Sequence, residues 1–451
     1  MSHAPGNPVD VNPYAATDVP SPRPSLVRYG VLGFAVTMSL LLYLDRFALS
    51  VALTTIMKEL DLDSQQMGRV TGVFFYVYAL AQVPAGWLSD RLGGRVTLTL
   101  YVLAWSLALG GMGFATGLIS LAVFRILLGL GQAGAYPCIA SVNKRWFPVT
   151  QRGFANSFTT MGGRTGNLLT TIFTPLLMAA VGATIGWTTG QWRVVFWFYS
   201  LLGVGWAVLF WTWFRDTPEQ HRSVNAGELN LLQHNSPPPA AAGTGVPLPP
   251  FRDMAVCPTM YFLCVIGVFV NIGWIFLVTF LPMFLEKVHK LDLKVVGILV
   301  AVPGIAAMCG GVAGGMSTDF LVRKIGLKWG RRATGIIATC GGALAYLGCL
   351  ITDNTVVLVI LFSIAAFMID FGLGSLWAVY QDIAGKHVAA VLGFANMCGN
   401  LAAGFFSEVI GRYAKAGAWS TVFAISALAL FATAAGWCLV DPTRPLVRDE
   451  R

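Results

Sequence analysis

The sequence predicts an all-α membrane protein with twelve transmembrane helices in two pseudo-symmetric six-helix bundles and both termini in the cytoplasm. Three observations predict this fold: the composition is strongly apolar, about a dozen apolar runs are long enough to cross a bilayer, and a proline-rich stretch divides them into two groups of six. Hydrophobic residues make up 56% of the 451 and charged residues 11%, with a mean hydropathy of +0.67. This composition excludes a single soluble domain, a secreted disulfide scaffold and a disordered protein.

The apolar runs predict helices, because open sheets cannot satisfy their backbone polar groups within lipid. In the first half of the chain the predicted spans are 30–57, 69–89, 96–115, 118–141, 153–181 and 192–214. In the second half they are 256–284, 295–318, 332–352, 355–380, 388–411 and 418–440.

Basic residues outside the spans predict the orientation. With the N-terminus inside, 19 Lys and Arg lie on the inner side and 8 on the outer side, a bias that is typical of cytoplasmic termini. We therefore assign the net charge of +9 to membrane topology and expect no nucleic acid partner. The predicted parts are a disordered cytoplasmic tail (1–27), two bundles (28–214 and 256–440), a cytoplasmic linker (215–255) and a second tail (441–451).

Two short motifs recur at equivalent places in the two halves. Gly86-Trp-Leu-Ser-Asp90-Arg91 follows the second span and Gly315-Met-Ser-Thr-Asp319 follows the eighth, 229 residues later. Gly153-Phe-Ala-Asn156 opens the fifth span and Gly393-Phe-Ala-Asn396 opens the eleventh, 240 residues later. The repetition predicts a duplicated six-helix unit, an architecture in which transporters bind substrate between the halves.

The first motif resembles the signature that members of the major facilitator superfamily carry between their second and third helices. In the pattern Gly86-x-x-x-Asp90-Arg91-x-Gly93-x-Arg95, Asp90 can pair with basic groups at the inner helix ends. Such pairing, repeated at Asp319, would latch the halves in one conformation. The alternative is a solvated loop whose charges only set topology.

A narrower resemblance covers nearly all of the chain after residue 28. It is to the anion:cation symporter family of that superfamily, which includes sugar-acid and vesicular glutamate transporters. The matching segments are Tyr43-Leu-Asp45-Arg46, Arg125-x-x-x-Gly129-x-Gly131, Trp146-Phe147-Pro148, Arg152-Gly153, Trp192-Arg193, Asp216-x-Pro218-Glu219-x-His221 and Asp382-Ile383-Ala384.

Six ionisable residues lie inside predicted spans, where each costs ~2.5–3.5 kcal/mol and therefore requires a reason. They are Asp45, Arg46, Arg125, Arg164, Asp370 and Glu408. A guanidinium is always charged and binds carboxylates bidentately, so Arg46 and Arg125 predict an anionic ligand. The resemblance implies the same role for both, whereas the alternative is a structural pair such as Asp45 with Arg125.

Other residues are predicted to line the substrate site. The resemblance implies substrate contacts for Tyr43 and Tyr78 in the first half and for Trp377 and Asn396 in the second. Neighbouring polar residues at similar depth extend this set, although asparagines also join helices in membranes; they are Ser375 and Asn400, with Asn271 and Trp274 as weaker members.

Arg164 adds a third cation to this region and shares a helix face with Asn167. Three cations suit a more highly charged ligand, such as a dicarboxylate or a phosphorylated acid. The alternative is that Arg164 offsets Asp370 or Glu408.

Gln132 departs from the family pattern, which usually has glutamate at this place. Glutamine keeps its hydrogen bonds but cannot take up a proton. The predicted proton carriers are then Asp45, Asp370 and Glu408, with Asp45 foremost because it adjoins Arg46.

These features imply a monomeric secondary transporter of the cell (inner) membrane that moves a small organic anion, such as a sugar acid, by proton-coupled symport. Gln132 keeps an exchanger or an uncoupled carrier open as the alternative. An anion-sensing receptor is more remote, because the polar tails are too short for an output domain. No cofactor or metal is expected, and no nucleophile–base pair or P-loop supports an enzyme or an ATP-driven pump.

Overall fold

The computed structural model describes residues 23–186, 190–234, 254, 256–291 and 293–446, and the regular structure within these ranges is helical. Most of the predicted N-terminal tail lies outside the described residues, as do the proline-rich stretch 236–250 and the last five residues.

The first half of the chain forms the predicted helices with one interruption. They are α1 (Val27–Leu60), α2 (Ser64–Leu92), α3 (Gly94–Met112), α4 (Leu118–Ala133), α5 (Ala135–Trp146), η1 (Val149–Gln151), α6 (Arg152–Ile185) and α7 (Gln191–Trp213). The fourth predicted span is divided at Gly134, where a side chain would overlap the ring of Tyr101. The break lies two residues after Gln132.

Residues 215–234 of the linker contain two short helices that the sequence does not predict, η2 (Pro218–Gln220) and α8 (Ala226–His234). Glu228 of α8 is fully buried and accepts hydrogen bonds from the Arg28 backbone N (3.1 Å) and from Arg28 Nη1 (3.0 Å). A carboxylate at this position satisfies the free N–H groups at the start of α1. This part of the linker is therefore anchored to the first bundle.

The second half comprises α10 (Pro258–Ile275), the π-helix η3 (Phe276–Phe280), α11 (Leu281–Lys287), α12 (Leu293–Gly348), α13 (Thr355–Ile383), α14 (Val388–Lys415) and α15 (Trp419–Leu439). The predicted spans 295–318 and 332–352 leave a loop between them, and this prediction is wrong. Instead, α12 is helical on both sides of a single break at Gly326. Gly326 (φ 81°, ψ 169°) matches Gly93 (φ 84°, ψ 162°) between α2 and α3. Only glycine adopts these angles readily, so each half turns the chain within one residue.

Ten helices in the described part of the chain are long and apolar enough to cross a membrane. This count treats α4 and α5 as one helix and α10, η3 and α11 as another. It also treats α12 as a single helix despite the break at Gly326.

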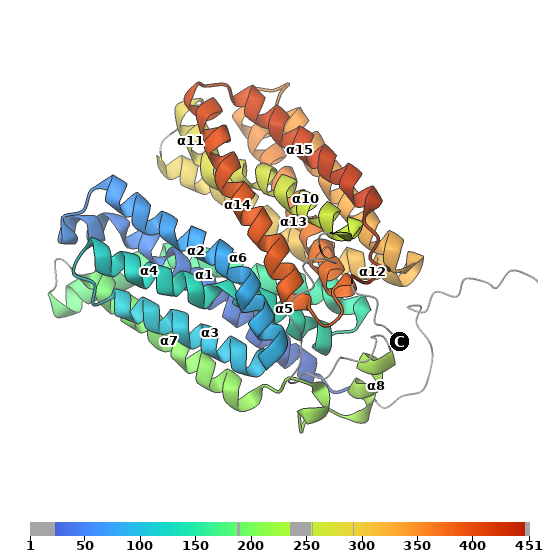
Figure 1. The fold of residues 1–451 in the computed structure, drawn as a ribbon. Helices are drawn as coiled ribbons and strands as arrows, with labels where there is room; N and C mark the ends of the chain where they lie inside the picture. The colour runs from blue at the N-terminus through green and yellow to red at the C-terminus, as the bar shows by residue number, and fades with distance from the viewer. Residues whose placement is uncertain (1–22, 187–189, 235–253, 255, 292, 447–451) are drawn as a thin grey trace, which may run out of the picture.

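The helices form two bundles, α1–α7 and α10–α15, that lie against each other at one end (Figure 1). At that end α2 packs on α14, α6 packs on α12 and α13, and α5 packs on α14. Towards the opposite end the ribbons of the two bundles diverge (Figure 1).

Glycines permit the closest helix contacts. A side chain on Gly162 or Gly166 of α6 would overlap backbone oxygens of α1, and one on Gly310 or Gly314 of α12 would overlap backbone oxygens of α13. Small residues allow such approach in membranes, where lipid supplies no hydrophobic force between helices.

Gly314→Ala is expected to destabilise the second bundle, because the added methyl overlaps the carbonyl of Phe371. Overpacking of this kind costs about 1–3 kcal/mol or more. Gly304→Ala is the matched control, because it lies on the same helix with no neighbouring atom within 4 Å. Thermal unfolding in detergent should show a lower midpoint for Gly314→Ala alone; equal midpoints would contradict the close packing of α12 on α13.

Candidate functional site

Arg46 lies on α1 among aromatic rings and is 8% exposed. Its Nε donates to Gln132 Oε1 at 3.0 Å, and its guanidinium carbon lies 4.4 Å from the ring centroid of Tyr78 and 5.2 Å from those of Tyr43 and Phe74. Rings attract a cation through their negative faces but do not neutralise it. Arg46 Nη2 is buried and has no hydrogen-bond partner among the described residues.

Arg125 of α4 lies beside Arg46 and is 2% exposed. Its Nη1 donates to the Arg46 backbone oxygen at 3.2 Å, and its guanidinium lies over the Phe74 ring at 5.5 Å. The Nε atom has no partner in the described part of the chain.

Asp45 does not pair with Arg125, the structural alternative that the sequence left open. Its Oδ2 accepts from Trp105 Nε1 at 3.0 Å, and its Oδ1 is buried without a described partner. Gln132 is fixed by two hydrogen bonds: its Nε2 donates to the Leu42 backbone oxygen at 3.0 Å, and its Oε1 accepts from Arg46 Nε at 3.0 Å. Within the described ranges, neither Arg46 nor Arg125 forms an ion pair.

A row of aromatic side chains joins Arg46 to the second bundle. The ring of Tyr43 meets that of Tyr136 of α5 edge-on at 6.3 Å, and Tyr136 meets Trp377 of α13 edge-on at 5.2 Å. The structure therefore brings together Tyr43, Tyr78 and Trp377 from the predicted set.

The remaining predicted residues of the second bundle lie apart from Arg46 or are held within one helix. Ser375 is fully buried, where its Oγ donates to the Arg331 backbone oxygen at 2.9 Å. Asn400 Nδ2 donates to the Asn396 backbone oxygen at 2.8 Å, and Asn271 Nδ2 to the Gly267 oxygen at 2.7 Å.

Of the other in-span charges, Arg164 pairs with Asp370 across the bundles at 2.7 Å, and Asn167 is exposed. Glu408 pairs with Arg412 one turn along α14 at 2.6 Å, with both side chains more than two-thirds exposed (67% and 77%).

Asp90 and Asp319 make equivalent contacts across the two bundles. Asp90 at the end of α2 accepts from the backbone N of Ala389 (3.0 Å) and Ala390 (2.9 Å) at the start of α14. Asp319 of α12 accepts from the backbone N of Gly153 (3.0 Å) and Phe154 (2.7 Å) at the start of α6. Each carboxylate thus meets the positive end of a helix in the other half.

The other members of the predicted latch have mixed positions. Gly86 abuts the Ala389 carbonyl, where a side chain would not fit. Arg91 is exposed beside Trp87. Arg95 bonds within its own bundle, donating from Nε and Nη2 to the Trp211 backbone oxygen at 3.0 and 2.8 Å.

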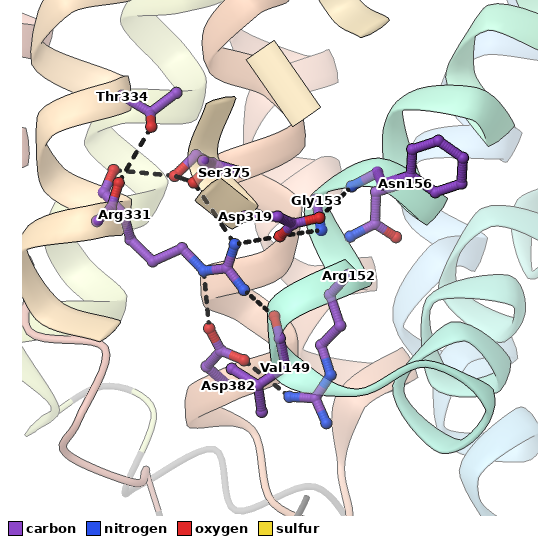
Figure 2. Close-up of polar contacts among 12 residues, drawn as sticks. Val149, Arg152, Gly153, Asn156, Asp319, Arg331, Thr334, Ser375 and Asp382 are labelled. Atoms are coloured by element: carbon purple, nitrogen blue, oxygen red, sulfur yellow. Dashed lines mark hydrogen bonds and ion pairs between the residues drawn. The ribbon is translucent and has the colours of Figure 1, made fainter. Parts of the chain in front are cut away.

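Asp382, at the end of α13, holds two buried arginines (Figure 2). Its Oδ1 accepts from Arg152 Nη1 of α6 at 2.8 Å and its Oδ2 from Arg331 Nε of α12 at 3.2 Å. Arg331 also pairs with Asp319 at 3.2 Å and donates to the Val149 backbone oxygen at 2.9 Å. We call the contacts of Asp90, Asp319 and Asp382 the gate.

A buried amide cluster lies beside these ion pairs. Asn156 Nδ2 of α6 donates to Gln381 Oε1 of α13 at 3.0 Å, and Gln381 Nε2 donates to the Ala140 backbone oxygen of α5 at 2.9 Å. Asn143 Nδ2 donates to Asn156 Oδ1 at 3.1 Å. The gate end of the molecule is thus closed by paired polar groups.

A family model described as the Major Facilitator Superfamily matches residues 35–407 of this chain. The chain belongs to the Major Facilitator Superfamily. It is a transporter rather than an enzyme, and a multi-pass protein of the cell (inner) membrane.

This transporter is similar to carriers of organic anions. It is 30% identical over 420 residues to the probable sulfoacetate transporter SauU of Cupriavidus necator, covering 92% of this chain and 94% of that one. It is 30% identical over 406 residues to the probable galactarate/D-glucarate transporter GarP of Escherichia coli K12, covering 85% and 87%. The proton:xylose symporter XylE has the same fold, with a TM-score of 0.67 at 17% identity over 92% of this chain and 96% of that chain.

The sequence of this transporter predicts no role for several residues of the gate and of the amide cluster beside it. Asp382 belongs to the motif Asp382-Ile383-Ala384, and no contact is predicted for Arg331 of the gate or for Asn156 and Gln381 of the cluster. A charged or amide residue at the end of an apolar span is a weak signal alone, because the same residue commonly faces water. Their partners on other helices, such as Asp382 for Arg331 and Gln381 for Asn156, lie 51 to 230 residues away, so only the folded structure identifies them.

Proposed function

We propose that this transporter is a secondary active carrier that moves a small organic anion between two six-helix bundles by alternating access. The observation that carries the proposal is the pair of buried guanidinium groups, Arg46 and Arg125, that have no ion-pair partner among the described residues. A buried cation without a counter-ion is costly. A negatively charged substrate would supply the missing charge and accept a hydrogen bond from Arg46 Nη2, which has no described partner.

The chemistry named for the relatives supports this class of substrate. Sulfoacetate, galactarate and D-glucarate each carry two acidic groups, and two arginines with neighbouring tyrosines suit an acid that also bears hydroxyls. We propose that Tyr43, Tyr78 and Trp377 contact the rest of the substrate.

We propose twelve crossings, with the gate at the cytoplasmic side. Adding α2 to the ten apolar helices and dividing α12 at Gly326 gives twelve. The bias of basic residues places the gate loops and both termini inside. The structure then corresponds to a carrier whose inner gate is closed. Both bundles and the site belong to one chain, so the proposed unit is a monomer.

Proton coupling is the proposed drive. An anion enters against a negative-inside potential at ~2.3 kcal/mol per charge per 100 mV, which an accompanying proton offsets. Asp45 is the proposed carrier of that proton, because it is fully buried next to Arg46 and its Oδ1 has no described partner.

Gln132 favours a second function, anion exchange without a coupled proton. It occupies the place beside Arg46 but cannot titrate. Counterflow without any response to an imposed pH gradient would identify an exchanger or an uncoupled carrier.

Gln132→Glu is expected to make anion binding pH-dependent. An ionised glutamate would pair with Arg46, now 3.0 Å from the amide oxygen, and compete with the substrate. Affinity should therefore fall as pH rises through the carboxyl titration, whereas the parent should change less. Calorimetric titrations over that pH range measure the difference, and parallel profiles would contradict the proposed place of Arg46 in the site.

The function is tested with four probe anions: sulfoacetate and D-glucarate as dianions, D-glucuronate and D-gluconate as monoanions. Purified full-length protein should be stabilised thermally by at least one of them, and liposomes containing it should exchange that labelled anion. An imposed inward proton gradient should accelerate uptake, and Asp45→Asn should remove that acceleration. Absence of both stabilisation and counterflow would overturn the proposal.

A further inference from the structure

Arg164 and Asp370 form a two-point ion pair between the bundles. Arg164 Nε of α6 donates to Asp370 Oδ2 of α13 at 2.9 Å, and Nη2 donates to Oδ1 at 2.7 Å. The guanidinium also lies 3.8 Å from the ring centroid of Trp274 on α10. Trp274 lies two residues before Phe276, where the π-helix η3 begins.

The pair lies well inside the molecule, away from the gate. Arg164 is twelve residues beyond Arg152 on α6, and Asp370 is twelve residues before Asp382 on α13. At the rise of an α-helix, each lies ~18 Å along its helix from the gate pair, which is near the middle of a bilayer core.

The pair also borders the proposed substrate site. A side chain on Gly163, the residue before Arg164, would lie 2.8 Å from both the Tyr43 ring and the Tyr136 hydroxyl. Tyr43 in turn covers Arg46. The side chain of Arg164 is 25% exposed, and that of Asp370 is 7% exposed. The cation is therefore accessible and the carboxylate is enclosed.

Arg164 is the charged group that faces Asp370. Of the elements packed against α13, α6 supplies Arg164, and α12 supplies Gly311, whose added Cβ would lie 4.0 Å from Asp370. In the described residues, α5, α10 and α14 place no titratable or charged group within hydrogen-bond or ion-pair distance of Asp370. A substrate that took Arg164 would thus leave Asp370 enclosed and without a counter-ion, and such a carboxylate binds a proton.

We propose that Arg164 binds a second anionic group of the substrate, and that Asp370 is its resting counter-ion. The substrate carboxylate or sulfonate replaces Asp370 on the guanidinium, and the released Asp370 carboxylate takes one proton from the aqueous side to become a neutral acid. A dianion is thereby accompanied by one more proton than a monoanion. This inference rests on the proposed function and names its substrate class.

The test compares D-glucarate with D-gluconate, which differ by one carboxylate. Calorimetry in two buffers of different ionisation enthalpy gives the affinity and the protons taken up on binding. The parent should bind D-glucarate at least about tenfold more tightly and take up about one additional proton with it. Arg164→Gln should bring the two affinities within about threefold, and Asp370→Asn should abolish the additional proton while keeping the preference.

Two controls separate the outcomes. Asp45→Asn should lower proton uptake equally for both anions. If either single variant of the pair fails to fold, the double variant Arg164→Gln/Asp370→Asn restores the charge balance and takes its place. Binding of both anions with an unchanged affinity ratio in Arg164→Gln, or an unchanged proton count in Asp370→Asn, would overturn this inference and leave the proposed function standing. Failure of the parent to bind any probe anion would overturn both.

Discussion

Arg46→Gln is expected to weaken binding of the probe anions by about 100-fold or more. Truncating one partner of a buried, hydrogen-bonded charge pair costs about 2–5 kcal/mol, which corresponds to a factor of about 30 to several thousand. Arg46 donates to Gln132 and otherwise meets rings, so its Nη2 is left for the ligand. Arg46→Lys should recover only part of the affinity, because an ammonium group lacks the planar fork.

The matched control for this result is Arg412→Gln. Arg412 is an exposed arginine whose pair with Glu408 lies within α14, and exposed pairs of this kind contribute little. Both variants are compared with the parent by thermal unfolding and by calorimetric titration. Wild-type affinity in a folded Arg46→Gln protein would contradict the assignment of Arg46 to the substrate.

Asp382→Asn is expected to open the gate. The substitution leaves Arg152 without its described carboxylate and leaves Arg331 with Asp319 alone. Breaking a buried pair costs about 3–5 kcal/mol, enough to reduce the ratio of closed to open molecules by about 100-fold or more. The loss of the Arg152–Asp382 pair falls on the closed state, because that pair joins the two bundles, whereas the Arg331–Asp382 pair lies within the second bundle.

The measurement is the distribution of distances between spin labels at the exposed positions Arg91 and Lys386, after the eight native cysteines are replaced. The longer-distance population should grow in Asp382→Asn and stay unchanged in Glu408→Gln. The double variant Arg152→Gln/Asp382→Asn removes a complete pair if the single variant is too unstable. An unchanged distribution in a folded Asp382→Asn protein would show that Asp382 does not hold the gate.

The sequence predicted the helices well because lipid imposes one simple requirement, a long apolar segment with its backbone bonds satisfied internally. It failed where a single residue changes the path of the chain. The loop expected around Gly326 is helical on both sides because a glycine in the left-handed region turns the chain in one step. The helix α8 was missed because its nine residues carry no span-length apolar signal.

The site was only partly predictable, because a residue's partner is a property of the tertiary structure. Placing Arg46, Tyr43 and Tyr78 in one site followed from the family resemblance, and the structure groups them. Arg164 had two equal alternatives in the sequence, and its described partner is Asp370. Glu408 was indistinguishable from Asp370 as an in-span carboxylate, although one is exposed and the other enclosed.

The central claim is that Arg46 and Arg125 hold an anion that the protein itself does not supply. The most direct measurement is an experimental structure of the full chain with the probe anion that stabilises it most. We expect an acidic group of that anion within hydrogen-bond distance of Arg46 Nη2, enclosed by Tyr43 and Tyr78. An anion bound elsewhere, or either arginine paired with a protein carboxylate, would contradict the claim.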